Sequence, residues 1–521
     1  MAVQTALRDL PELSRYHAAV RPERVAMTFE GRETTFGQLD RRASRVANGL
    51  LATCTTAQAR IAVLDKNSDL FYELLFGAAK ARDVLVPVNW RLAPPEIAYI
   101  VNDAEAELLF VGEEYVETIE RLLPELRTVK RVIALAGGHP AWEGYAAWRD
   151  HQSVADPRLE TLGVDVAIQL YTSGTTGRPK GAQLTQEVVM VTLATGRESY
   201  YPCSADDVNL LCMPQYHWAG TFVGLFALHG GARTVIARQF NPTEILQLIP
   251  SERITRALIV PAAQLALLNA PGCEATDFSS LVSITYGASP IPLDLLRQAM
   301  ATFECDFRQA YGLTEIGVVT HLPPEDHDVA GSRRMRSCGK PLPTAEIKVV
   351  GEDGAVLPPD QVGEIVVRTP QLMKGYWRLP EATAASLRNG WFSTGDAGYF
   401  DEDGYLYIYD RVKDMIVSGG ENVYPAEVES AMFGHPAVAD VAVIGVPDER
   451  WGETVKAVVV RKPGVDVTEA ELVTHARERI AHYKAPKSVD FVEELPRNPS
   501  GKILKRILRA PYWEGFERQV N

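Results

Sequence analysis

Short apolar runs alternate with amphipathic segments between residues 60 and 136, and this alternation constrains the fold most strongly. The apolar runs span residues 61–64, 84–88, 108–111 and 132–136. Between the first two, Phe71, Leu74, Leu75 and Ala78 recur at intervals of three and four residues, which predicts a helix with one apolar face. Two further helices are predicted over residues 95–102 and 115–126. Apolar strands joined by helices favour a parallel sheet covered on both faces, so we predict an α/β fold.

The pattern changes after about Asp410. Residues 439–445 and 453–461 read as an antiparallel pair of strands, followed by a helix over 468–483 and a strand over 489–492. A unit of roughly 110 residues is large enough for a small core of its own. We therefore expect a large N-terminal domain of sheets and helices over residues 1–410 and a small α+β domain over 411–521, joined within Asp410–Lys413.

Composition excludes several classes of protein. Lysine and arginine number 53 against 67 aspartate and glutamate residues, a net charge of −14, which argues against binding to nucleic acid. The six cysteines show no zinc-ligand spacing, and a disulfide framework is not indicated. No apolar stretch reaches the length of about 20 residues that a membrane span needs. We expect a cytoplasmic protein without an integral membrane segment.

A glycine-rich loop follows a predicted strand at residues 168–171. The loop reads TSGTTGRPKG, from Thr172 to Gly181. Glycines let backbone amides approach a phosphate, hydroxyls add donors, and Arg178 and Lys180 add positive charge. The P-loop spacing fails because Pro179 replaces the second glycine and Gly181 follows the lysine. A nucleotide loop and a mobile surface turn both remain open from these residues alone.

The loop resembles the phosphate-binding signature of the adenylate-forming enzymes, which include acyl-CoA synthetases, nonribosomal-peptide adenylation domains and firefly luciferases. Further motifs follow in that family's order, and the likeness covers essentially the whole chain, most closely to bacterial acyl-CoA synthetases. These motifs are YGAS (286–289), YGLTE (311–315), GEIVVR (363–368), STGDAG (393–398), DRVKDMIVSGGENVYPAEVE (410–429) and PRNPSGKILK (496–505).

The resemblance implies a site for ATP and Mg²⁺. The expected phosphate cradle is Thr172, Ser173, Gly174, Thr175, Thr176, Gly177 and Lys180. Thr314 is expected to contact phosphate and Glu315 to bind Mg²⁺, although a Thr-Glu pair alone would suggest a helix cap. Asp396 and Arg411 correspond to ribose contacts. The residues expected around the adenine are Gly287, Ala288, Ser289, Tyr311 and Gly312.

The C-terminal motifs imply a moving catalytic group. Lys502 resembles the family's catalytic lysine, which reaches the reacting phosphate from a mobile small domain. Lys413 lies at the family's hinge position. Gly419 and Gly420 resemble the loop that faces the pantetheine arm of CoA, and Asn422 is expected to face the acyl-phosphate.

The acyl substrate is less clearly indicated. MPQYHWAGTF, over residues 213–222, lacks the aspartate that binds an amino-acid ammonium, so a carboxylic acid without an α-amino group is favoured. Similarity to plant hydroxycinnamate:CoA ligases implies a small, apolar pocket. Its expected lining is His217, Ala219, Val223, Gly287, Ala310, Gly312, Gly317, Val318 and Val319. Whether His217 gates this pocket or packs against it stays open. Two positions depart from the family pattern, Gln186 in place of histidine and Ala310 in place of glycine.

These inferences predict an ATP-dependent acyl-CoA ligase that forms an acyl-adenylate from a fatty or aryl acid and transfers the acyl group to CoA. Two alternatives remain, an acyl-AMP ligase that loads a carrier-protein thiol and a nucleotide-binding relative without turnover. The relatives are often monomers or homodimers, and the sequence does not choose between these states.

Overall fold

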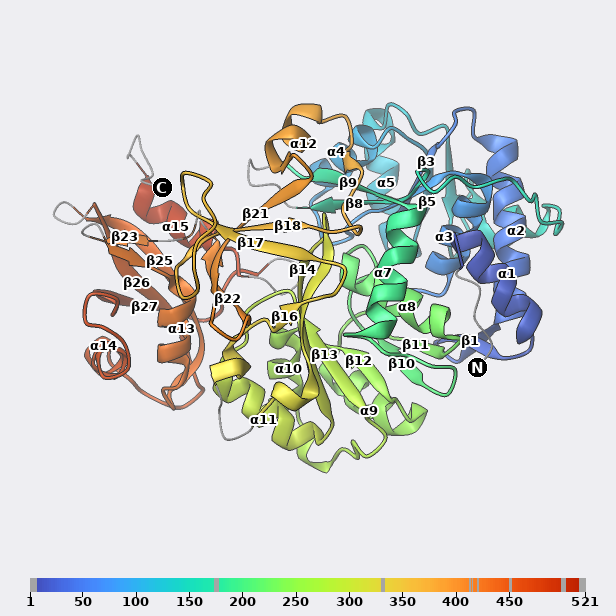
Figure 1. Ribbon diagram of the computed structural model, residues 1–521. Helices are drawn as coiled ribbons and strands as arrows, with labels where there is room; N and C mark the ends of the chain where they lie inside the picture. Colours follow the sequence, from blue (N-terminus) through green and yellow to red (C-terminus); the bar gives the residue numbers. More distant parts are fainter. Residues whose placement is uncertain are drawn as a thin grey trace.

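The computed structural model describes most of the chain. The described residues are 7–172, 178–328, 333–411, 414, 416–418, 421–448, 452–497 and 503–514. Four sheets carry the fold, two large ones packed with helices on the right of Figure 1, a smaller one between them and the C-terminal unit, and one inside that unit.

An eight-stranded sheet contains the strands predicted from the alternating pattern. Strands β3, β4, β5 and β6 are parallel. Ile61 and Val63 point into the main core, whereas Ala62 and Leu64 join a second core on the other face, so apolar residues are needed at every position. In spatial order the strands are β19 (Gly375–Tyr376), β9 (Lys180–Thr185), β8 (Val166–Thr172), β4 (Val84–Pro87), β3 (Arg60–Leu64), β5 (Ala106–Val111), β6 (Arg131–Ala134) and β7 (Glu143–Gly144).

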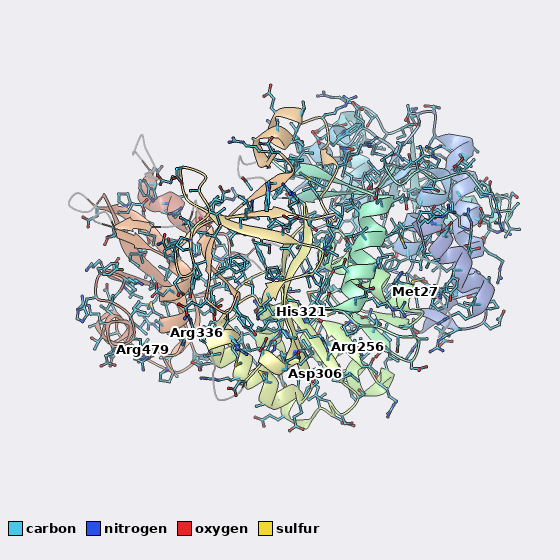
Figure 2. All side chains as sticks on the ribbon, in the orientation of Figure 1. Met27, Arg256, Asp306, His321, Arg336 and Arg479 are labelled. Carbon is cyan, nitrogen blue, oxygen red and sulfur yellow. The ribbon has the colours of Figure 1, made fainter. Side chains whose placement is uncertain are left out.

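A nine-stranded sheet forms the second layer, and its central strands are parallel. Its order is β16 (Lys340–Pro341), β15 (Gly317–Leu322), β14 (Asp306–Leu313), β13 (Ser283–Gly287), β12 (Arg256–Leu258), β10 (Val208–Leu211), β11 (Arg233–Ile236), β1 (Val25–Phe29) and β2 (Arg32–Thr35). Figure 2 labels Met27, Arg256 and His321, which mark strands β1, β12 and β15 across this sheet.

The helices cover the two large sheets and the small unit. They are α1 (Leu10–Val20), α2 (Phe36–Thr53), α3 (Leu70–Ala81), α4 (Pro94–Asp103), α5 (Val116–Leu122), α6 (Tyr145–Asp150), α7 (Gln186–Glu198), α8 (Trp218–Gly230), α9 (Pro242–Glu252), α10 (Pro261–Leu268), α11 (Leu293–Phe303), α12 (Pro380–Ser386), α13 (Pro425–Phe433), α14 (Glu469–Arg477) and α15 (Lys505–Trp513). Among the described helices, none is long and apolar enough to cross a membrane.

A third sheet leads into the C-terminal unit. Its strands are β17 (Glu346–Val350), β18 (Gly363–Arg368), β21 (Trp391–Phe400), β20 (Leu387–Arg388) and β22 (Leu406–Arg411). The C-terminal unit, orange to red in Figure 1, has its own apolar core and its own sheet. That sheet contains β24 (Glu421–Val423), β23 (Ile416–Ser418), β26 (Gly452–Arg461), β25 (Val438–Asp448) and β27 (Ser488–Val492).

The predicted fold class is confirmed, and the antiparallel pairing of β25 with β26 agrees with the sequence pattern. Two predicted helix boundaries were wrong. The helix expected over residues 115–126 is divided, with α5 ending at Leu122 and a 3₁₀ turn, Leu123–Glu125, containing Pro124. The helix expected to reach residue 483 ends at Arg477, with Glu478 as its C-cap. Strand β22 ends at Arg411, and its residues 410 and 411 pair with Ala397 and Asp396. The placement of the domain boundary stays a prediction.

Candidate active site

The glycine-rich loop lies between two paired strands. Strand β8 ends at Thr172, β9 begins at Lys180, and these two residues face each other in the antiparallel ladder. Residues Ser173, Gly174, Thr175, Thr176 and Gly177 lie outside the described residues. The Lys180 ammonium lies 5.0 Å from the centroid of the Tyr376 ring, whereas Arg178 is exposed and lies over Tyr99. Of the two loop cations, Lys180 is therefore the one held by the fold.

Glu315 lies in a tight turn between β14 and β15. Gly312 makes this turn possible, because a Cβ atom there would lie 1.9 Å from the carbonyl oxygen of Gly317. Glu315 is buried, and its Oε1 accepts a hydrogen bond from Thr172 Oγ1 at 3.3 Å. The same oxygen accepts a hydrogen bond from the Tyr376 hydroxyl at 2.8 Å. The predicted metal ligand and the start of the phosphate loop are therefore in contact.

The predicted adenine residues gather at the ends of β13 and β14. Gly287 faces Ala310 in the parallel ladder, and a Cβ atom on Gly287 would lie 2.1 Å from the Ala310 carbonyl oxygen. Ala288 has a φ of 67°, in the left-handed region that non-glycine residues rarely adopt. Such strained positions cluster at functional sites. Ser289 follows immediately and is half-buried.

A buried histidine, His327, contacts Tyr286 on β13, directly before the residues predicted to flank the adenine. The Tyr286 hydroxyl lies 3.0 Å from Nε2 of His327, and Nδ1 of His327 lies 2.8 Å from the carbonyl oxygen of Pro323. Because a carbonyl only accepts, Nδ1 carries the proton and Nε2 accepts from the tyrosine. Burial lowers the pKa of His327 to about 4, so the imidazole is neutral near pH 7.

Asp396, a predicted ribose contact, is hydrogen-bonded to Tyr311, one of the residues predicted to surround the adenine. The Tyr311 hydroxyl donates to Asp396 Oδ2 at 2.8 Å. Burial and the Asp396 carboxylate raise the pKa of Tyr311 well above its usual value, so the phenol keeps its proton and remains a donor. Arg411 faces Asp396 in the ladder between β22 and β21. The two residues expected to hold the ribose thus occupy paired positions.

The described acidic residues suit Mg²⁺ held mainly by phosphate. Among them, no group of three or more histidine, cysteine, aspartate or glutamate side chains could bind a metal by itself. Magnesium bound with a nucleotide commonly uses one or two carboxylates together with phosphate oxygens and water. A single carboxylate from Glu315, next to the phosphate loop, fits that pattern, and Thr314 precedes it in the turn.

The residues predicted to line the acyl pocket come from three strands of the nine-stranded sheet and from the start of helix α8. Gly287, Ala310, Gly317 and Val318 lie together on the adjacent strands β13, β14 and β15, and Val319 follows on β15. Ala219 and Val223 lie on α8, which packs on β10, β11 and β12. His217 precedes α8, its ring lies 4.6 Å from that of Tyr216, and its buried Nε2 has no hydrogen-bond partner among the described residues.

Most of the site residues predicted in the C-terminal unit lie outside the described residues. Lys413, Gly419, Gly420 and Lys502 are not among the described residues, so the structure does not place them. Asn422 lies on β24 and faces Val417 in the ladder with β23. The roles assigned to all five remain predictions.

Family models match both parts of the chain. Residues 14–377 match the model described as AMP-binding enzyme, and residues 427–502 match the AMP-binding enzyme C-terminal domain. The chain belongs to the AMP-binding enzyme family. The resemblance to adenylate-forming enzymes is confirmed, and this AMP-binding enzyme is an adenylate-forming ligase that uses ATP and Mg²⁺.

Relatives match this AMP-binding enzyme over nearly its full length. It is 41% identical over 520 residues to a fatty acid–[acyl-carrier-protein] ligase, ScoC, of Streptomyces coeruleorubidus, covering 99% of this chain and 98% of ScoC. It is 39% identical over 505 residues to a feruloyl-CoA synthase of an Amycolatopsis species, covering 95% of this chain and 97% of that enzyme. The crystal structure of ATP-bound MatB from Rhodopseudomonas palustris superposes with a TM-score of 0.88 at 32% identity, covering 98% and 100% of the two chains.

Sequence reasoning missed Tyr376 and Trp377. Tyr376 donates to Glu315, and the Trp377 indole N–H donates to the carbonyl oxygen of Asp103 at 2.9 Å. The only signal was a GYW sequence after the GEIVVR motif, and an aromatic pair in a predicted loop does not reveal a carboxylate partner. The departure at Gln186 is also explained, because its side-chain oxygen accepts from the backbone N–H of Leu10 at 3.1 Å.

Proposed function

We propose that the protein activates a carboxylic acid without an α-amino group as an acyl-adenylate and then transfers the acyl group to the thiol of CoA. The observation that carries this proposal is the contact of Glu315 with Thr172 at the phosphate loop. In the first step a carboxylate oxygen bonds to the α-phosphorus of ATP and pyrophosphate leaves. Two anions meet in this step, so positive charge and donors are needed at fixed positions.

The residues of the large domain would hold ATP at both ends. Asp396 and Arg411 would bind the ribose hydroxyls, and the backbone at Gly287–Ser289 would flank the adenine with Tyr311. Lys180 and the hydroxyl of Thr172 would bind phosphate oxygens. Mg²⁺ on Glu315 would neutralise phosphate charge. Thr314 lies beside Glu315 and would add a donor.

Lys502 would supply the remaining charge from the C-terminal unit. A lysine there would stabilise charge on the attacked phosphate and the carboxylate, and it is not needed for the thiol step. We infer that residues 411–521 move as a domain relative to residues 1–410, with Lys413 at the hinge. Gly419 and Gly420 would then face the pantetheine arm, and Asn422 the acyl-phosphate.

The acyl group we propose is alkyl or aryl and of moderate length. Support comes from the small and apolar residues that β13, β14 and β15 bring together next to the residues predicted to flank the adenine. Two of the relatives named above are a fatty acid–[acyl-carrier-protein] ligase and a feruloyl-CoA synthase. His217 is neutral near pH 7, because burial lowers its pKa to about 4, which suits it to an apolar pocket.

The thiol acceptor has a second candidate. One relative of high identity is named for transfer to an acyl-carrier protein, whereas others are named for CoA. Carrier-protein loading is therefore the alternative second half-reaction, and it leaves the adenylation half unchanged.

The test is a screen for AMP release over fatty acids, benzoates and cinnamates, with free CoA present or absent. Acid-dependent pyrophosphate exchange together with CoA-stimulated AMP release would support the CoA ligase. Exchange without CoA stimulation, with stimulation by a carrier protein bearing a pantetheine thiol, would support the alternative. No exchange with any acid would refute both and favour the binding protein without turnover.

Variants of the C-terminal unit test the order of steps. Lys502→Ala should slow pyrophosphate exchange by about two to three orders of magnitude, the scale expected for one transition-state contact. Exchange near that of the wild type would remove Lys502 from its proposed role. Lys413→Pro should spare adenylation more than thioester formation, and equal losses in both steps would contradict the hinge.

A further inference from the structure

The segment of residues 373–377 connects two parts of the site that are distant in sequence. The backbone N–H of Met373 donates to the carbonyl oxygen of Glu315 at 2.7 Å. On its other side the segment pairs with the strand that follows the phosphate loop, through Gly375 with Gln183 and Tyr376 with Ala182. The segment therefore fixes the Glu315 turn and strand β9 relative to each other through backbone hydrogen bonds.

Trp377 anchors this segment to strands β9 and β3 and to helix α4. Its backbone N–H donates to the carbonyl oxygen of Gly181 at 2.8 Å, and its indole N–H donates to Asp103 at the end of α4. The Arg60 guanidinium lies 3.5 Å from the Trp377 ring centroid, so the indole is held on one face by a buried cation. With three neighbours from separate elements, Trp377 leaves the adjacent residue little freedom to move.

The side chain of Tyr376 contacts two predicted catalytic groups at once. Its hydroxyl donates to Glu315 Oε1 at 2.8 Å, and its ring lies 5.0 Å from the Lys180 ammonium. The ring is almost fully buried, with 8% of the residue exposed. A phenol that donates to a carboxylate forms a short, charge-assisted bond, so this contact fixes the carboxylate strongly.

The hydrogen bonds to Glu315 are uneven. Both described side-chain donors, Thr172 and Tyr376, use Oε1. Within the described part of the chain, Oε2 receives no side-chain hydrogen bond. A carboxylate with one oxygen fixed by protein donors and the other left open is arranged to give a single oxygen to a metal ion.

We propose that Tyr376 is a positioning residue for adenylation. It holds Glu315 so that one carboxylate oxygen faces Mg²⁺, and its ring holds the Lys180 ammonium at a set distance from that metal ligand. This inference rests on the proposed function and adds to it a residue that acts through Glu315 and Lys180 rather than on the substrate.

The test separates the two contacts with two variants. Tyr376→Phe keeps the ring beside Lys180 and removes the donor to Glu315, whereas Tyr376→Leu removes both. Tyr145→Phe is the matched control, because its hydroxyl donates to the buried carboxylate of Glu73 at 2.9 Å, away from Glu315. Calorimetry measures ATP binding with Mg²⁺ and with EDTA, and the readout is the ratio of the two dissociation constants.

In the wild type we expect Mg²⁺ to tighten ATP binding, and Tyr376→Phe should reduce that ratio about tenfold, as for loss of a partner that orients a metal ligand. Binding in EDTA should change little in Tyr376→Phe and weaken in Tyr376→Leu, because only the second loses the ring beside Lys180. Tyr145→Phe should keep the wild-type ratio. Because the ratio compares two titrations of one preparation, a lower yield of folded protein leaves it unchanged.

An unchanged ratio in Tyr376→Phe would overturn the proposal, and so would an equal loss in Tyr145→Phe. Pyrophosphate exchange on the same preparations distinguishes failure of the proposed function from failure of the proposed role of Tyr376. Wild-type protein without acid-dependent exchange would refute the proposed function, whereas active wild type with an unaffected Tyr376→Phe would refute only the role of Tyr376. A Mg²⁺ concentration for half-maximal exchange raised about tenfold in Tyr376→Phe would support it.

Discussion

Replacement of Gly312 by alanine should displace the turn that carries Glu315. The new Cβ atom would lie 1.9 Å from the Gly317 carbonyl oxygen and 2.7 Å from the Val318 Cα atom, both in the backbone of β15. Contacts below 3.0 Å essentially do not occur for real Cβ atoms, so the two strands must separate by at least 1.1 Å, the difference between 3.0 and 1.9 Å. No side-chain rotation relieves this contact, because the atoms that must move belong to the main chain.

A displacement of about 1 Å at a catalytic group costs about 100-fold in rate. Gly312→Ala should therefore lower kcat/KM for acid-dependent pyrophosphate exchange about 100-fold, which corresponds to about 2.7 kcal/mol. Overpacking should also reduce the free energy of unfolding by about 1–3 kcal/mol. Thermal unfolding followed by circular dichroism would confirm that the variant is folded during the assay.

Gly144→Ala is the matched control, because a Cβ atom there meets nothing within 4 Å and the backbone φ of −74° suits alanine. It should leave exchange within about twofold of the wild type. A folded Gly312→Ala variant with exchange equal to that of Gly144→Ala would refute the argument, since it would show that the approach of β14 to β15 does not fix the position of Glu315.

Three further changes have defined outcomes. Tyr311→Phe removes the donor to Asp396 and should raise the KM for ATP about tenfold, the scale of one hydrogen bond to a charged group, as an ATP saturation curve would show. Lys80→Ala removes the ammonium shared by the half-buried carboxylates of Asp40 and Asp156, of which Asp156 keeps its ion pair with Arg15, and should cost about 1–3 kcal/mol in a urea unfolding titration. A cost below about 0.5 kcal/mol would contradict it. Lowering the pH from about 6.5 toward 4 should reduce the free energy of unfolding, because five histidines that are buried and neutral in the folded protein become protonated in the unfolded chain. Equal stability at pH 7 and pH 5 would contradict this expectation. Burial lowers the pKa of each from 6.5 to about 4, and they are His17, His217, His229, His321 and His327.

Much of the fold could be predicted because its signals are local. Strand β3 is apolar from Ile61 to Leu64 because both of its faces are covered there, and the apolar residues spaced three and four apart in α3 belong to the main core. The errors occur where a single residue outweighs the pattern. Pro124 divides a helix whose apolar spacing would otherwise continue.

The site was predicted where a motif contains the functional residue and missed where a contact depends on tertiary structure. Glu315 and Thr172 were identified from their motifs, and the structure places them in hydrogen-bonding contact. Tyr376 was not identified, because its partners are 61 residues away at Glu315 and on the far side of the glycine-rich loop at Lys180. The pairing of β19 with β9 brings it there, and two residues of strand carry too little pattern to predict that pairing.

The placement of the nucleotide-side hydrogen bonds has a consequence for building hybrid enzymes. The bonds that fix Glu315 and Asp396 come from Thr172, Tyr376 and Tyr311, all upstream of the end of β22. A crossover placed just after Arg411 would therefore exchange the whole C-terminal unit without cutting any of these three bonds. Grafting the corresponding unit of a carrier-protein ligase or of a CoA ligase onto residues 1–411 should change the choice of thiol and keep the ATP contacts of this chain, while the donor unit supplies the lysine for adenylation.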